Sequence, residues 1–126
     1  MKLTRWTCCM WLVAAVALAG CSRETERLAE DLTGGDVGRG KNAFRKYGCG
    51  TCHEIHGEQT AQGHVGPTFH DFAAQSYLPG GLTSSPDNLV RWIRHPREVE
   101  PLTAMPELGV TERDARDLAA YLYTQR

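Results

Sequence analysis

Two closely spaced cysteines followed directly by a histidine constrain this chain more than any other feature. Cys49-Gly50-Thr51-Cys52-His53 has the C-x-x-C-H spacing of covalent haem attachment, in which two thiols bond to one porphyrin and the next imidazole binds its iron. A thioredoxin-like motif would need a βαβ pattern around it, and a structural zinc site would need a second ligand pair. The sequence shows neither, and a chance pair of buried cysteines leaves His53 unexplained. We therefore expect one covalently bound haem on Cys49, Cys52 and His53.

Composition and cysteine positions narrow the class of protein. The 126 residues favour one domain, and 14 Lys and Arg against 15 Asp and Glu argue against nucleic acid as a partner. Three of the five cysteines lie at or before residue 21. The rest of the chain holds only the motif pair, so no disulfide framework is expected.

Residues 1–20 have the layout of an export signal. A basic start precedes an apolar run over residues 6–19, which is shorter than the roughly 20 residues of a membrane span. The run ends in Leu18-Ala19-Gly20-Cys21, which resembles the lipobox of bacterial lipoproteins; the resemblance implies acylation of Cys21. The alternatives are a simple signal peptide cut near Gly20 or a short uncleaved anchor. Because acyl chains anchor a protein stably, we expect a lipid-anchored protein of the bacterial cell envelope, facing the periplasm or the exterior.

The next segment, SRETERLAEDLTGG, is polar and ends in two glycines. It has room for one or two helical turns but almost no apolar face to bury, so a tether is expected. Fully extended, it would reach about 45 Å. The predicted organisation is a lipoprotein signal peptide (1–20), a lipidated N-terminus with a polar tether (21–35), and one domain (36–126).

Capping residues and apolar periodicity predict the helices of the domain. The pattern indicates helices over residues 36–47, 86–95 and 111–125, and a short helix over residues 68–76. Thr111 with Asp114 is typical of a capping box at the start of the last helix.

Two residue pairs give the chain a family resemblance. Gly40 and Phe44 in the first helix, with Leu118 and Tyr121 in the last, match the helix crossing of class I cytochromes c, which the chain resembles. Glycine is needed there because two backbones approach closely. The resemblance implies an all-α fold packed around one haem c.

A narrower resemblance covers residues 76–121. The segments SYLPGGL, SPDNLVRWIRHP, TAMPELGV and DLAAYL are similar to the cytochrome c domain fused to the copper-bearing subunit of caa-type cytochrome oxidases. Neither a copper-binding domain nor transmembrane helices precede this stretch in the chain. The resemblance implies electron delivery to a terminal oxidase by a separate, lipid-tethered carrier.

The family resemblance also assigns further residues to the haem. It implies that the Pro67 carbonyl accepts a hydrogen bond from Nδ1 of His53, and that Met105 is the sixth iron ligand. Met105 is the only methionine after the leader, although a lone methionine is more often core filler. The other candidate ligands are His56, His64, His70 and His95.

Trp92 has two interpretations. It either fills the bottom of the haem pocket or, as the resemblance implies, donates its indole N–H to a haem propionate. Candidates for neutralising the propionates are Arg39, Arg91 and Arg94.

Together these features predict a monohaem c-type cytochrome that carries single electrons in a respiratory chain, from an upstream donor to a terminal oxidase. No acid–base pair or substrate pocket is recognisable, so we expect a carrier without a small-molecule substrate rather than an enzyme. One alternative is a haem-based sensor or peroxidase-like protein in which Met105 dissociates. Another is a non-haem interaction module with a metal or dithiol at Cys49 and Cys52.

Overall fold

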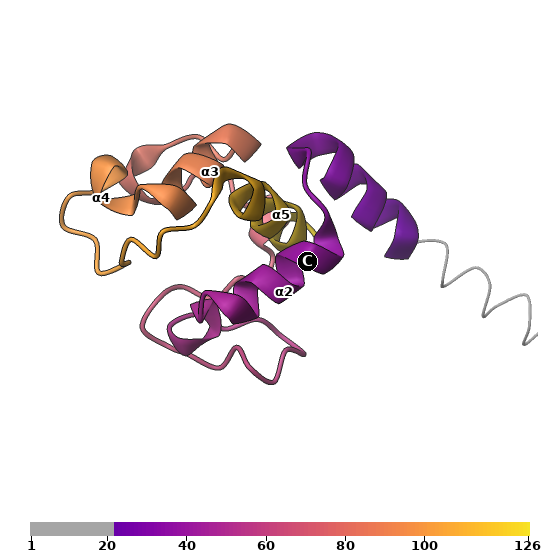
Figure 1. Cartoon of the computed structure of the whole chain (residues 1–126), viewed down its shortest axis with the longest axis horizontal. Helices are drawn as coiled ribbons and strands as arrows, with labels where there is room; N and C mark the ends of the chain where they lie inside the picture. The colour runs from indigo at the N-terminus through magenta and orange to yellow at the C-terminus, as the bar shows by residue number, and fades with distance from the viewer. Residues whose placement is uncertain (1–21) are drawn as a thin grey trace, which may run out of the picture.

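The computed structural model describes residues 22–126, and over these residues the protein is helical (Figure 1). Within this part of the chain the only β-pairing is two isolated bridges, which confirms the predicted all-α class. A helix over residues 22–33, called the N-terminal helix below, precedes α2 (Val37–Lys46), η1 (Cys49–Thr51), η2 (Phe72–Ala74), η3 (Pro79–Gly81), α3 (Pro86–Arg94), α4 (Pro96–Val99) and α5 (Glu112–Tyr123). The predicted signal peptide and Cys21 lie outside the described residues. None of the helices in residues 22–126 is long and apolar enough to cross a membrane.

A capping residue precedes each of the three longer domain helices, and its side chain accepts a hydrogen bond from the backbone N–H three residues later. These caps are Asp36 for α2, Ser85 for α3 and Thr111 for α5. Only half of the predicted capping box at α5 forms. The carboxylate of Asp114 instead accepts hydrogen bonds from Lys46 Nζ (2.9 Å) and Tyr47 Oη (2.7 Å), so it ties α5 to α2.

The crossing of α2 and α5 takes the predicted form. A Cβ at Gly40 would overlap the Asp117 carbonyl and lie 2.8 Å from the Tyr121 Cβ, so only glycine lets the two backbones meet here. One turn further on, the rings of Phe44 and Tyr121 pack edge to face with centroids 5.9 Å apart.

A buried carboxylate anchors the start of α2. Asp117, 2% exposed, accepts a hydrogen bond from the Asp36 N–H and two from the Arg39 guanidinium, each 2.8 Å long. Burying a carboxylate is costly unless it is paired, and the two-point contact with Arg39 supplies that partner.

A second ion-pair cluster fixes the loop that follows the C-x-x-C-H motif. Glu58, 8% exposed, accepts a hydrogen bond from Arg45 of α2 (2.8 Å) and one from Thr60 (2.9 Å), and pairs with Lys41 (3.2 Å). The Arg45 guanidinium, then Thr60 and Lys41, lower the pKa of Glu58 to about 2. The carboxylate is therefore charged at neutral pH, and it holds the loop against α2.

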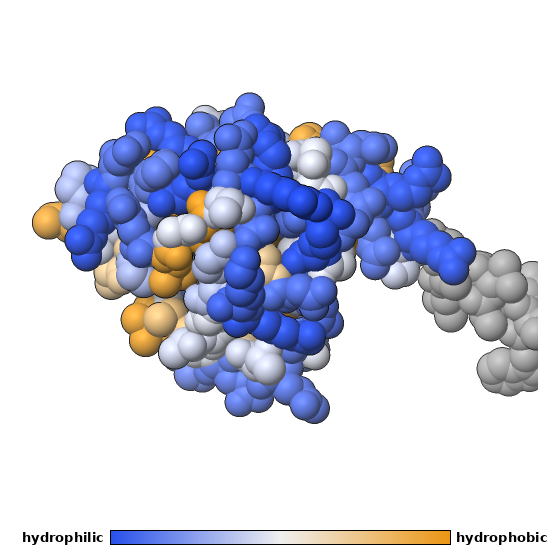
Figure 2. Space-filling view, viewed as in Figure 1, coloured by the Kyte–Doolittle hydropathy of each residue, from blue (hydrophilic) through white to orange (hydrophobic). Residues whose placement is uncertain are grey.

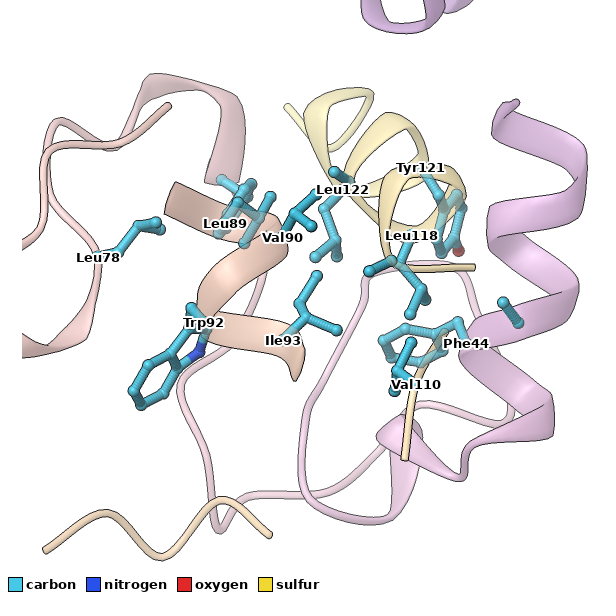
Figure 3. Close-up of a cluster of buried hydrophobic side chains, with 14 of the residues drawn as sticks. Phe44, Leu78, Leu89, Val90, Trp92, Ile93, Val110, Leu118, Tyr121 and Leu122 are labelled. Carbon is cyan, nitrogen blue, oxygen red and sulfur yellow. The ribbon is translucent and has the colours of Figure 1, made fainter. Parts of the chain in front are cut away.

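The apolar core lies between α3 and α5 and extends to α2 (Figure 3). Leu89, Val90 and Ile93 of α3 face Leu118 and Leu122 of α5, and Phe44 closes the cluster on the α2 side. Trp92, on the same helix as Leu89, also belongs to this cluster, with its ring directed away from Leu118 and Leu122 (Figure 3).

One expectation for the middle of the chain was wrong, and one short helix there had not been expected. Residues 68–76 form only the three-residue turn η2, because Asp71 adopts a left-handed φ of 54° and the Phe69 N–H bonds back to the Glu54 carbonyl (2.9 Å). The short helix α4 was not predicted. It begins directly after the end of α3 because proline is well suited to the first position of a helix, and Pro96 occupies it.

The expected tether also differs from the structure. Residues 22–33 form the N-terminal helix, which spans about 18 Å rather than the extended reach of about 45 Å. Ala29 and Thr33 are buried at 4% and 2% exposure. Sequence reasoning looked for large apolar side chains on this segment, whereas two small residues make the contact.

Candidate functional site

One cavity collects every cofactor residue predicted in the domain. It has a volume of about 510 Å³, within the range of ligand pockets, and is lined by residues from widely separated segments. The predicted residues that line it are Cys49, Cys52, His53, Pro67, Trp92 and Met105.

The walls of the cavity are largely apolar and come from the core described above. The helical wall residues include Phe44, Leu89, Ile93, Leu118 and Leu122. These side chains come from α2, α3 and α5, and they belong both to the packed cluster of Figure 3 and to the cavity wall. Such a lining excludes water and suits a large planar apolar group.

The end of α2 places the two cysteines at the cavity. Gly48 ends the helix with a left-handed φ of 68°, and the tight turn η1 follows, closed by the His53 N–H to the Cys49 carbonyl (3.0 Å). Gly50 faces the chain rather than the cavity, since a Cβ there would overlap the Thr60 carbonyl. Contacts with its own loop therefore help to hold the turn in place.

The His53 ring is held on three sides. Its Nδ1 lies 2.8 Å from the Pro67 carbonyl oxygen, so with the proton on Nδ1 the other nitrogen, Nε2, is left as a donor for a metal. Phe69 stacks on the ring with centroids 4.4 Å apart. A Cβ at Gly66 would lie 2.6 Å from Nδ1 and 3.0 Å from Nε2.

Sequence reasoning found Pro67 but missed Gly66 and Phe69 as positioning residues. Gly66 carried one signal, its place directly before Pro67. No sequence signal pointed to Phe69 as a positioning residue, because the segment around it was interpreted as a helix. Both line the cavity, and both also lie against the imidazole ring of His53.

The Cys49 thiol does not have the character of a reactive thiol in a redox dithiol. Burial raises the pKa of Cys49 to about 11, so this thiol stays protonated at neutral pH, whereas reactive C-x-x-C sites depend on a lowered thiol pKa. Within residues 22–126 no three His, Cys, Asp or Glu side chains gather closely enough to hold a metal ion. Neither the dithiol nor the zinc interpretation is supported by this geometry.

Met105 lies in the loop between α4 and α5, and its side chain is partly buried against the core. The Met105 N–H donates to Thr103 Oγ1 (3.1 Å), which fixes the backbone beside the cavity. None of the alternative ligands His56, His64, His70 and His95 lines the cavity. His64 lies 3.8 Å from the Glu54 carboxylate and His70 lies 3.2 Å from that of Asp71.

Trp92 lines the cavity and is 9% exposed. None of the residues in the described part of the chain accepts a hydrogen bond from its indole, so the N–H is left for an occupant of the cavity or for water. The three arginines considered for the propionates do not line the cavity, and Arg39 is engaged by Asp117.

The donor set and shape of this cavity fit a covalently attached haem. Two thiols, one oriented imidazole and one thioether surround an apolar space, and these are the groups that would hold a covalent haem with a His/Met ligand pair. A comparison with protein families finds a match to the family described as Cytochrome c over residues 37–126, which includes every residue that lines the cavity. Proteins of this family bind haem c covalently and transfer electrons through it. The chain therefore belongs to the cytochrome c family.

Proposed function

We propose that this protein carries single electrons in a bacterial respiratory chain, anchored outside the cytoplasm by a lipid on Cys21. It receives electrons from an upstream respiratory donor and delivers them to a membrane terminal oxidase. The observation that carries the proposal is that the two motif cysteines, His53 and Met105 all line one apolar cavity. Lipobox resemblance and the similarity to oxidase cytochrome c domains support the anchor and the acceptor.

The residues that line the cavity have separate roles in an electron carrier. Cys49 and Cys52 attach the cofactor, His53 Nε2 and the Met105 sulfur are its iron donors, and Pro67 keeps the imidazole proton on Nδ1. The haem supplies the one-electron chemistry. The apolar walls exclude water from it, and with a thioether donor this favours ferrous iron and a raised potential.

An apolar rim around the cavity suits short-lived docking. Val65 and Leu108 line the cavity and are also exposed to solvent, at 76% and 39%. Leu102, 93% exposed, lies three residues before Met105 in the same loop. Figure 2 shows apolar side chains gathered mainly on the side of the molecule away from the N-terminal helix. Residues 21–126 carry 12 Lys and Arg against 15 Asp and Glu, a formal net charge of only −3, so we expect partners to dock by apolar contact more than by charge.

Oxidase turnover with this protein as the sole electron donor tests the proposal. We expect the rate to vary weakly with ionic strength, and to fall when Val65 and Leu108 are replaced by serine. Leu28→Ser is the matched control, because Leu28 is a leucine of comparable exposure (54%) on the N-terminal helix and does not line the cavity. A steep loss of rate with salt would contradict the docking mode. No turnover at all would remove the oxidase as partner.

A further inference from the structure

The N-terminal helix precedes the region that matches the cytochrome c family, which begins at residue 37. It nevertheless packs against the domain, with Ala29 and Thr33 almost fully buried. Figure 1 shows it lying beside α5 and the start of α2. The helix is thus an addition to the family fold whose purpose the haem site does not explain.

Hydrogen bonds join the end of this helix to both α2 and α5. The Arg116 guanidinium of α5 donates to the Thr33 carbonyl (3.3 Å), and the Val37 N–H of α2 donates to the Glu30 carboxylate (3.0 Å). Thr33 Oγ1 also accepts the Gly35 N–H (3.2 Å), which holds the turn that follows. These contacts fix both the position and the direction of the helix.

The two glycines after the helix form a close contact rather than a swivel. Gly34 has a left-handed φ of +70°, and its N–H closes the helix on the Glu30 carbonyl (2.8 Å). Gly35 lies against α5, where a Cβ would overlap the Arg116 carbonyl and come within 2.7 Å of the Asp117 nitrogen. A Gly-Gly pair that reads as flexible in the sequence is therefore packed against backbone.

The helix also depends on this docking for its existence. Isolated helices of about twelve residues are marginal in water, and this one is polar on most of its surface. If it detached, it would largely unfold. This segment is therefore helical only while it is docked against the domain.

We propose that the N-terminal helix is a rigid arm that holds the mouth of the haem cavity at a fixed distance and direction from the lipid-bearing end of the protein. The inference rests on the proposed lipid at Cys21, which directly precedes the helix. In Figure 1 the start of the helix lies at the opposite end of the view from α4 and the loop that carries Met105. The arm thus keeps the Met105 loop, which forms one wall of the cavity, away from the lipid-bearing end. The partner it fits is a membrane-anchored redox protein whose docking face stands in water, clear of the bilayer.

A distance measurement tests the arm without using the lipid. A nitroxide on Glu24→Cys, an exposed position on the helix, and the haem iron form a spin pair in a soluble holoprotein in which Cys21 is replaced by serine. Pulsed electron paramagnetic resonance should give one narrow distance distribution. Gly35→Ala should broaden it, because the added Cβ drives the helix off α5. Gly38→Ala should leave it narrow, because a Cβ there meets only the Asp36 carboxylate at 3.5 Å. A wild-type distribution as broad as that of Gly35→Ala would overturn the arm.

Hydrogen exchange keeps the inference testable if Gly35→Ala fails to fold. In the same soluble holoprotein, the amides of residues 22–33 should exchange about tenfold or more slowly than in a free peptide of that sequence. Equal rates would refute the docked helix. Broad distances with normal oxidase turnover would reject the arm and leave the electron carrier standing. A narrow distribution in this soluble protein, together with a wild-type protein that neither supports oxidase turnover nor anchors to membranes, would reject the proposed function instead.

Discussion

Replacing Gly66 with alanine tests how the haem-site histidine is held. The added Cβ would overlap Cε1 of His53 and lie 2.6 Å from Nδ1, whereas ordinary Cβ contacts begin at 3.4 Å. The ring and the chain must therefore separate by roughly 1 Å. The 2.8 Å contact between Nδ1 and the Pro67 carbonyl then stretches beyond hydrogen-bond range.

The size of the effect follows from the loss of that one bond. A net hydrogen bond contributes about 0.5–1.5 kcal/mol, which for a one-electron couple corresponds to about 20–65 mV. The bond makes the imidazole a stronger donor and so stabilises ferric iron. Only the difference in the strength of this bond between the ferric and ferrous states shifts the potential, so its loss should raise the reduction potential by at most that amount, while Cys49 and Cys52 keep the haem attached. A redox titration followed by visible absorption of the holoprotein measures the shift.

Gly57→Asn serves as the control in the same loop. Gly57 has a φ of +78° and nothing within 4 Å of an added Cβ, and asparagine tolerates this backbone conformation. Its potential should equal that of wild type. If Gly66→Ala also matched wild type, the packing of Gly66 on His53 would have no role in orienting the ligand.

Three further outcomes are expected. Gly40→Ala should lower the free energy of unfolding by about 3 kcal/mol in a denaturant titration, because the added Cβ overlaps the backbone of α5. The control Gly38→Ala should be neutral or stabilising by up to about 1 kcal/mol. Equal unfolding midpoints for the two variants would contradict the close helix crossing. Arg45 helps to lower the pKa of Glu58 from 4.5 to about 2. Above pH 4.5 the charged carboxylate should therefore add about 1–2 kcal/mol to the free energy of unfolding, a figure that already allows for the exposure of its partners. This contribution should be lost as the pH falls through 2. Glu58→Gln should flatten that acid limb of the stability curve, and an unchanged limb would assign it to other groups. Cys21→Ser should release a spectrally normal protein from membranes, and retention after a high-salt wash would point to an uncleaved apolar anchor.

The parts that sequence reasoning predicted are those whose chemistry is local or fixed by spacing. Covalent haem attachment needs two thiols and an imidazole within five residues, so Cys49, Cys52 and His53 could be identified directly. Helix starts were equally local, because a cap and the N–H that it binds lie three residues apart. The Gly40 crossing was found through family resemblance rather than through spacing alone.

The parts that it missed depend on contacts between distant segments. The place of Phe69 on His53 follows from the bond of its N–H to the Glu54 carbonyl, and the left-handed Asp71 then prevents the helix that the local pattern favours. The N-terminal helix docks through Ala29 and Thr33, which contribute too little apolar surface to mark a buried face. Such contacts become visible only once the chain is folded.

The carrier function depends most on whether Met105 closes the iron to small molecules. Carbon monoxide added to the ferrous holoprotein tests this directly. We predict that wild type does not bind it, and that Met105→Ala binds it while keeping the haem covalently attached and lowering the potential, because a soft thioether ligand that favours ferrous iron is lost. Rapid binding by wild type would contradict the carrier and favour the haem-based sensor, and a Met105→Ala spectrum identical to that of wild type would show that another residue is the sixth ligand.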